Sequence, residues 1–147
     1  MKANVERADE GEKGVVLIAD RALGRRLTTK RFLEEQGYRV IAVGSGAEAR
    51  LTLQNNNVAA LLVTRQLPDS SGLEIAKDLS LFSLSGRPYV LLMNEAHDTP
   101  VNAAPGVDDI MAAESRSAEE LHLRLRRAFR CRAYWSGGSF SSSSLVA

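Results

Sequence analysis

The sequence has little of several features that mark special classes of protein. It contains a single cysteine, Cys131, which excludes an internal disulfide and fits a reducing compartment. Aromatic residues make up only 5% of the chain, so the core must be mostly aliphatic. The longest uninterrupted apolar runs, Val15–Ala19 and Val58–Val63, fall far short of the roughly 20 residues needed to cross a bilayer. These shortages argue against a disulfide-stapled or membrane-spanning protein and favour a cytoplasmic one.

The chain also lacks an excess of charge of either sign. Its 19 basic and 18 acidic side chains leave a net charge of +1, so no global field marks it as a binder of nucleic acid or membrane. With 44% apolar and 25% charged residues among 147, the composition is typical of one globular domain. We expect a flexible leader at residues 1–13 without the apolar segment of a secretory signal, one domain at 14–132, and a flexible Ser/Gly-rich tail at 133–147.

Short apolar segments recur along the expected domain and predict strands. Val15–Ala19 and Val58–Val63 lack the alternation of polar and apolar residues, which is typical of strands buried on both faces of a parallel sheet. The sequence therefore predicts an α/β fold in which helices cover both faces of such a sheet. The expected strands are 15–19, 38–43, 58–63, 89–93 and a short run around 107–111.

The segments between these strands carry the spacing of amphipathic helices. Behind the first strand the apolar residues Leu23, Leu27, Phe32 and Leu33 predict a helix that ends at Gly37. The stretch 95–106 carries two prolines and mainly polar residues where the alternation requires a helix. The other expected helices are 45–54, one that follows the turn at 68–72, and 117–132 with Ser117 as N-cap.

Five pieces of sequence occur in a familiar order. They are Leu-Ile-Ala-Asp (17–20), Leu-Glu-Glu-Gln-Gly-Tyr-Arg-Val (33–40), Gly-Ala-Glu-Ala (46–49), Val-Thr-Arg-Gln-Leu-Pro-Asp-Ser-Ser-Gly-Leu-Glu (63–74) and Gly-Val-Asp-Asp-Ile (106–110). With these pieces the chain, from about residue 16 to 130, resembles the receiver domains of two-component response regulators. The resemblance implies a receiver-like (βα)5 fold of flavodoxin-like topology, a three-layer sandwich whose five-stranded parallel sheet has the order 2-1-3-4-5.

The resemblance also implies where the chemistry of a working receiver would be. Such domains accept a phosphoryl group on an aspartate after the third strand, beside an acidic pair that holds Mg²⁺, a Ser or Thr after the fourth strand and a Lys after the fifth. Here Asp20 keeps the first acid of the pair. The other positions are changed, to Arg21 for the second acid, Thr64 for the acceptor, Met93 for the hydroxyl and Ala113 for the lysine.

These changes remove the groups that phosphoryl transfer requires. Mg²⁺ prefers hard oxygen ligands, whereas Arg21 places a permanent cation beside the one remaining acid. Thr64 has no neighbouring base in the sequence, and neither a thioether at Met93 nor a methyl at Ala113 can stabilise a phosphoryl oxygen. We therefore expect no aspartyl-phosphate switch, a lost Mg²⁺ site, no other cofactor or metal, and no enzymatic activity.

Several alternatives stay open for single residues. Asp20 serves as a residual metal ligand or, in the interpretation we favour, as an N-cap or ion-pair partner of a nearby arginine. Arg21 pairs with Asp20 or Asp69, or points to solvent. Asp69 and Asp20 are the candidates for an unusual phosphoacceptor, which would leave the domain phosphorylatable. A small-ligand sensor that uses the vacated cleft is another alternative, although no Gly-rich phosphate loop follows the first strand.

The last expected helix gives the one regional charge signal. Between residues 121 and 132 it contains no acid, and apolar residues on one face should pack against the sheet and leave the arginines outward. We expect this helix to bind an acidic protein surface, with a homodimer possible and with nucleic acid and membrane not expected. The predicted interaction residues are Arg124, Arg126, Arg127 and Arg130. The domain is thus expected to be a protein-interaction module.

Overall fold

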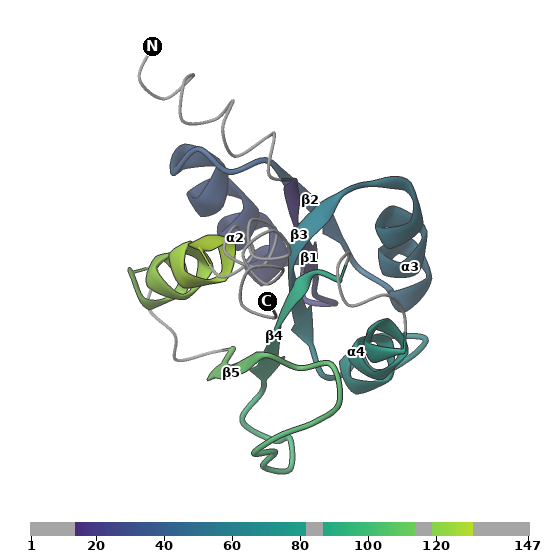
Figure 1. The fold of residues 1–147 in the computed structure, drawn as a ribbon. Helices are drawn as coiled ribbons and strands as arrows, with labels where there is room; N and C mark the ends of the chain where they lie inside the picture. The colour runs from purple at the N-terminus through teal and green to yellow at the C-terminus, as the bar shows by residue number, and fades with distance from the viewer. Residues whose placement is uncertain (1–13, 82–86, 114–118, 131–147) are drawn as a thin grey trace, which may run out of the picture.

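A parallel sheet forms the middle layer of the molecule and helices cover both of its faces (Figure 1). The structure, a computed structural model, describes residues 14–81, 87–113 and 119–130. The expected leader and tail, the N-cap at Ser117 and the thiol of Cys131 lie outside the described residues. None of the helices in the described ranges is long and apolar enough to span a membrane.

The five strands pair in the order that the resemblance implies. The order is β2-β1-β3-β4-β5, and all four pairings are parallel. Every residue of β1 and β3 is buried, which explains why these two segments have no polar alternation. The strands are β1 (Val15–Ala19), β2 (Val40–Val43), β3 (Val58–Thr64), β4 (Tyr89–Asn94) and β5 (Asp109–Ala112).

The sheet separates the core into two apolar clusters. One lies under α2 (Leu23–Glu35) and the helical residues 119–130, and the other lies under α3 (Gly46–Asn55) and α4 (Gly72–Ser80) (Figure 1). Successive residues of each central strand point to opposite clusters, as the pleat of a strand requires. The predicted α/β fold class and strand order are therefore confirmed.

The predicted apolar face of the first helix is wrong in its first two turns. Leu23 and Leu27 are 57% and 53% exposed, whereas Thr29 and Leu33 are the buried residues of α2. Leu27 precedes Leu33 by six positions, so at about 3.6 residues per turn its side chain is rotated roughly 120° from the buried face. Leu23 lies four positions before Leu27 and shares its exposed direction.

The connection from β4 to β5 contains turns instead of the helix that strict alternation requires. Arg65 binds the loop by donating to the Thr99 hydroxyl at 2.8 Å and to the Thr99 carbonyl, and Gln66 donates to Asp98 at 2.9 Å. The loop then passes against α4 at Gly106, where φ is +80° and a Cβ would lie 1.9 Å from the Ala76 carbonyl oxygen. Only glycine combines this left-handed backbone with such a close approach.

Candidate functional site

The carboxyl edge of the sheet brings four of the five predicted positions into one row. Asp20 directly follows β1, Thr64 ends β3, Met93 lies near the end of β4, and Ala113 directly follows β5. Thr64 and Met93 are direct partners in the parallel register. All four residues are at most 2% exposed. The structure thus confirms that the strand ends meet at one edge, as expected for an open α/β sheet.

Asp20 is a buried carboxylate with a complete set of donors. Its Oδ1 accepts from the Ala22 backbone N–H at 2.9 Å and from Nη2 of Arg25 at 2.8 Å, and its Oδ2 accepts from Nε of Arg25 at 2.6 Å. The two guanidinium bonds form the bidentate geometry that makes arginine–carboxylate pairs strong. The expectation that Asp20 pairs with a nearby arginine is therefore confirmed, but the partner is Arg25 and not Arg21.

Arg25 also reaches a second buried carboxylate. Its Nη2 donates to Oε2 of Glu95 at 2.6 Å, and the Glu95 side chain is only 6% exposed. Hydrogen bonds to Asp20, followed by those to Glu95, raise the pKa of Arg25 above its ordinary value, so the cation is permanent. One guanidinium from the first turn of α2 therefore links the ends of β1 and β4.

The second oxygen of Glu95 lies among two further polar groups. Oε1 is buried and accepts no hydrogen bond within the described residues, while Nη2 of Arg21 lies 3.5 Å away and Nε2 of His97 lies 3.4 Å away. Arg21 keeps 45% of its side chain exposed and pairs with neither Asp20 nor Asp69 in the structure. Two carboxylates thus lie beside two guanidinium groups and one imidazole.

Thr64, Met93 and Ala113 contribute no charge to this edge. The Thr64 hydroxyl lies 3.4 Å from the carbonyl oxygens of both Ala19 and Gln66, so it serves the local main chain. Met93 and Ala113 belong to the apolar cluster beneath α2 and residues 119–130. These positions therefore strengthen the core rather than supply the hydroxyl and ammonium groups of a phosphoryl-binding site.

Asp69 lies outside this row and caps a helix. Its two carboxylate oxygens accept from the backbone N–H groups of Gly46 at 2.7 Å and Ala47 at 2.9 Å, at the start of α3. These hydrogen bonds lower the pKa of Asp69 below its ordinary value. The helix dipole favours a negative charge at this place. The contacts of Asp69 are those of a structural carboxylate that joins the β3–α4 loop to α3.

The carboxylates at the carboxyl edge already bind cations of the chain, which bears on the magnesium ion that the resemblance implies. Mg²⁺ needs a near-octahedral set of oxygen ligands that usually includes one or two free carboxylates. Both oxygens of Asp20 are bound by Arg25, and Arg21 adds a second cation. In the described ranges no three His, Cys, Asp or Glu side chains form a group that could hold a metal. A divalent ion would have to displace a guanidinium from two buried carboxylates.

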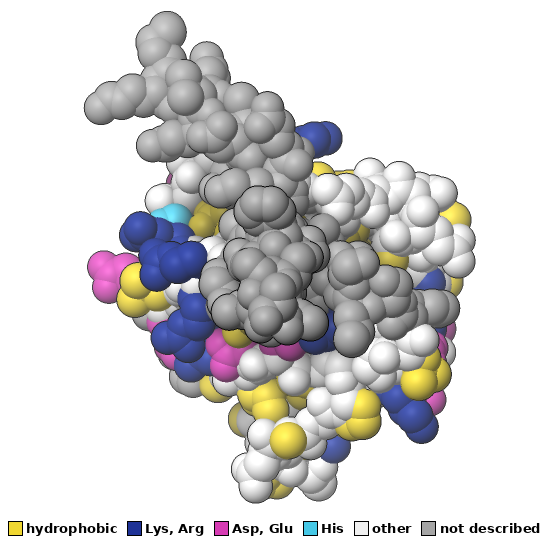
Figure 2. Space-filling view, viewed as in Figure 1, with side chains coloured by type: hydrophobic (Ala, Val, Ile, Leu, Met, Phe, Trp, Pro, Cys, Tyr) yellow, Lys and Arg dark blue, Asp and Glu magenta, His cyan; other side chains and the backbone are white. Residues whose placement is uncertain are grey.

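The C-terminal helical segment presents three of the four predicted interaction residues. Within residues 119–130, an exposed stripe with spacing of three and four consists of Leu123, Arg126, Arg127 and Arg130, hereafter the basic stripe. Figure 2 shows Lys and Arg side chains gathered over this helix.

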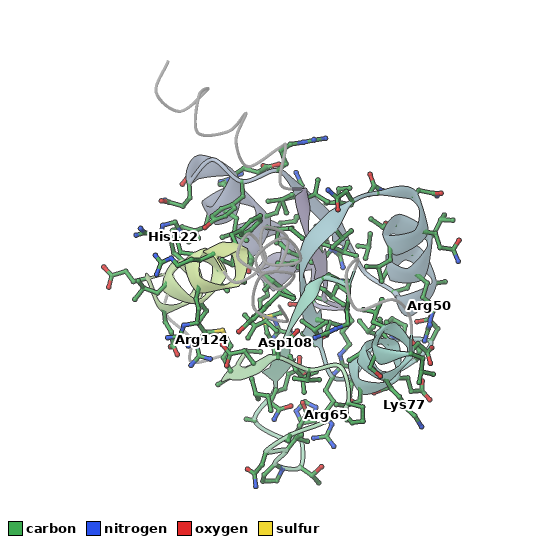
Figure 3. All side chains as sticks on the ribbon, in the orientation of Figure 1. Arg50, Arg65, Lys77, Asp108, His122 and Arg124 are labelled. Carbon is green, nitrogen blue, oxygen red and sulfur yellow. The ribbon has the colours of Figure 1, made fainter. Side chains whose placement is uncertain are left out.

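Arg124 does not belong to the basic stripe, contrary to the prediction. Its Nη1 donates to Asp109 at 2.7 Å, its Nη2 donates to Glu120 at 2.8 Å, and its side chain is 26% exposed (Figure 3). The position adjoins the buried Leu125, so the side chain leans toward β5, where Asp109 provides a partner.

Sequence reasoning missed Arg25 and Glu95, the two residues that complete the site. Their positions in the sequence could have identified both as candidates. Arg25 lies in the first turn of the helix that follows Asp20, and Glu95 is the first residue after β4. Charged residues at the carboxyl ends of strands are the ones to test for contacts with each other.

No family model matches the chain, and the curated relatives that it matches include a sensor protein and a transcriptional regulatory protein. The chain is 40% identical over 67 residues to the sensor protein TorS of Escherichia coli (strain K12), a match that covers 45% of this chain and 7% of TorS. It is 30% identical over 112 residues to the TorCAD operon transcriptional regulatory protein TorR of the same strain, covering 76% of this chain. The chain spans 48% of the length of TorR.

Comparison with solved structures shows the same fold in several receiver domains. The signal receiver domain of an HD domain-containing protein from Pseudomonas fluorescens Pf-5 superposes with a TM-score of 0.72 at 16% identity, covering 82% of this chain and 98% of that one. A CheY-like receiver domain from Methylobacillus flagellatus gives 0.67 at 21% identity, with coverage of 77% and 96%. The chain therefore has the fold of a response regulator receiver domain.

Proposed function

We propose that this receiver-fold chain is a non-catalytic domain that is not phosphorylated and that acts as a protein-interaction module in two-component-type signalling in the cytoplasm. The similarity to a sensor protein and a transcriptional regulatory protein supports this setting. The observation that carries the proposal is the guanidinium of Arg25 on Asp20 and Glu95.

Arg25 supplies to the carboxyl edge the positive charge that a metal would otherwise supply. Its contacts at 2.6 Å to each carboxylate are short and charge-assisted. Removing one partner from a buried ion pair typically costs about 3–5 kcal/mol, so Arg25 resists displacement. The cation is covalently attached, and its interactions therefore do not depend on the concentration of a metal.

Phosphoryl transfer would lack charge stabilisation at this edge. The reaction depends on preorganised cations and donors around the transferred group. The Thr64 hydroxyl lies against main-chain carbonyls, while Met93 and Ala113 are packed in the apolar cluster. Asp69 is bound to the start of α3, and Asp20 is saturated by Arg25. Each carboxylate that could accept a phosphoryl group thus already has a structural role.

The basic stripe provides the docking surface in this proposal. Arg126, Arg127 and Arg130 are exposed around Leu123 along one side of the helix. An apolar residue amid like charges suits a partner with an acidic rim, because complementary charge speeds association and fixes orientation. Glu119 is exposed on the same face one turn before Leu123, so the uncompensated positive charge lies along the part of the stripe from Arg126 to Arg130.

Incubation with acetyl phosphate and Mg²⁺, followed by intact mass spectrometry, tests the loss of phosphorylation. We expect the chain to keep its unmodified mass while a receiver with a complete acidic pair, treated in parallel, gains a phosphoryl group. A phosphoryl adduct on this chain would overturn the proposal. The variants Asp69→Asn and Asp20→Asn would then identify the acceptor by loss of the adduct.

Charge reversal tests the docking surface separately. The double variant Arg126→Glu/Arg127→Glu should lose a partner that the parent chain retains from a cell extract, and Lys77→Glu on the exposed side of α4 is the matched control. Equal retention by all three proteins would refute the basic stripe as the docking surface. Tight binding of the parent chain to heparin at low salt would instead favour nucleic acid.

A further inference from the structure

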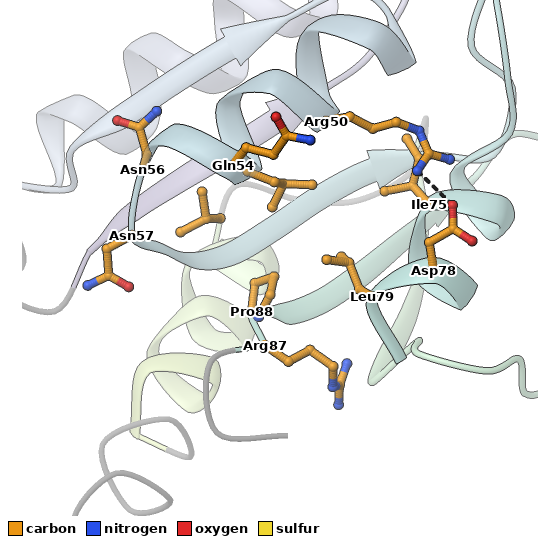
Figure 4. A pocket seen from close by; sticks show the side chains of 11 residues that line it. Arg50, Gln54, Asn56, Asn57, Ile75, Asp78, Leu79, Arg87 and Pro88 are labelled. Carbon is orange, nitrogen blue, oxygen red and sulfur yellow. Dashed lines mark hydrogen bonds and ion pairs between the residues drawn. The ribbon is translucent and has the colours of Figure 1, made fainter. Parts of the chain in front are cut away.

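A cavity of about 390 Å³ lies between α3 and α4 at the amino end of the sheet, away from the carboxyl edge described above (Figure 4). Val58 begins β3 and Pro88 precedes β4, so the cavity opens where these two strands begin. Its volume falls within the range of small-molecule sites and is too small for a folded partner. None of the proposed receiver functions uses this end of the sheet.

The inner surface of the cavity is apolar. Val58, Ile75 and Pro88 line it although they are themselves buried, and Leu53 and Leu79 form half-buried walls from α3 and α4. A ligand in the cavity would therefore cover aliphatic side chains that are already largely shielded from water by their neighbours. Burial of an apolar body is therefore the main source of affinity that the cavity offers.

Two guanidinium groups stand at the rim of the cavity. Arg50 from α3 donates to Asp78 from α4 at 2.6 Å, and both side chains are 40–45% exposed (Figure 4). Exposed pairs of this kind contribute little to stability, so the Arg50 guanidinium is free to exchange partners at low cost. Arg87 lines the other side and is held by Asp108 at 2.8 Å and by the Gly106 carbonyl at 2.9 Å.

We propose that this cavity binds a small organic monoanion with an apolar body, such as an aromatic carboxylate. The apolar part lies on Val58, Ile75 and Pro88, and the carboxylate binds the Arg50 guanidinium. Arg87 is paired with Asp108 outside the lining, so the Arg50 guanidinium, whose own pair with Asp78 is exposed, is the cation that an anion would meet. Because α3 and α4 supply opposite walls, the bound anion connects the two helices that cover this face of the sheet.

Titration of the ¹⁵N-labelled chain with naphthoate tests the site. We expect saturable amide shifts confined to the lining residues, and weaker shifts with the neutral naphthamide. Arg50→Gln should weaken naphthoate binding about tenfold, because a charge-assisted contact is replaced by a neutral one. Lys77→Gln is the matched control, since Lys77 is exposed on α4 and does not line the cavity. It should bind as the parent chain does.

A variant that fills the entrance of the cavity tests the site without changing its charge. Gln54 is an exposed residue at the rim, so Gln54→Trp should preserve the fold, as the amide spectrum reports, and close the cavity to naphthoate. Absence of saturable shifts in the parent chain, or equal affinity for naphthoate and naphthamide, would overturn the proposal. So would unchanged binding to Gln54→Trp. These outcomes leave the phosphorylation experiment unaffected, because the two sites lie at opposite ends of the sheet.

Discussion

A single arginine binds both buried carboxylates at the carboxyl edge of the sheet. Arg25 pairs with both Asp20 and Glu95, whose side chains are 1% and 6% exposed. We expect Arg25→Ala to lower the free energy of unfolding by about 3–5 kcal/mol, because it leaves two buried carboxylates without their shared cation. Urea denaturation at neutral pH measures the change. A loss below about 1 kcal/mol would show that the guanidinium is replaceable by water, as exposed ion pairs are.

Arg21 provides the matched control for this experiment. It lies 3.5 Å from the same Glu95 carboxylate but keeps 45% of its side chain exposed. Contacts of this kind are screened by solvent, so Arg21→Ala should change the free energy of unfolding by less than about 1 kcal/mol. The difference between the two alanine variants therefore separates the buried bridge from general positive charge at this edge.

The positions of the site were predictable from sequence, and its contacts were not. Asp20, Thr64, Met93 and Ala113 follow from the strand ends, because parallel strands meet at one edge. The bond between Arg25 and Glu95 joins residues 70 positions apart. Neither periodicity nor local spacing relates residues so far apart in the sequence. Whether Arg21 or Arg25 binds Glu95 depends on which of the two side chains points toward β4 in the folded chain.

The packing of helical residues 119–130 against α2 contains a titratable group. The His122 ring meets the rings of Phe32 and Tyr38 edge-on, with centroids 6.5 Å and 5.8 Å away. Burial, and secondarily the charge of Arg126, lower the pKa of His122 below its ordinary value. The folded state therefore favours the neutral imidazole. Its contribution to stability is present above the unfolded pKa of about 6.5 and is lost as the pH falls through the lower folded value.

We expect His122→Phe to reduce the pH dependence of unfolding below about pH 6.5, because phenylalanine keeps an aromatic ring without the proton equilibrium. Urea midpoints at a series of pH values measure the effect. An unchanged loss of stability at acid pH in His122→Phe would contradict this expectation.

At the scale of whole elements, the strands were easier to predict than the helices. β1 and β3 are buried on both faces, so their sequences are unbroken apolar runs. The predicted apolar face of the first helix was wrong because Leu23 and Leu27 have helical spacing but face solvent. In the β4–β5 connection, the prolines and polar residues indicated that a helix was unfavourable, and the structure has a loop there. Arg65 and Gln66 hold this loop by hydrogen bonds.

At the scale of the whole molecule, several contacts among the described residues join separate elements through groups of the chain alone. Arg25 links the ends of β1 and β4, Asp69 links the β3–α4 loop to α3, and Gly106 seats the β4–β5 loop on α4. A ligand shifts a conformational equilibrium only by its differential affinity for two states. In the function proposed above, Arg25 keeps its pairing with Asp20 and Glu95, so neither Mg²⁺ nor a phosphoryl analogue is expected to bind this edge.

We therefore expect the ¹⁵N amide spectrum to stay unchanged when Mg²⁺ and beryllofluoride are added together. Sodium chloride at equal ionic strength is the control, because exposed ion pairs such as Arg50–Asp78 respond to salt alone. Saturable shifts at Asp20, Thr64 and Glu95 that sodium chloride does not reproduce would contradict this expectation. They would mean that Arg25 leaves its carboxylates when a divalent ion competes, and the domain would then be a metal-dependent switch.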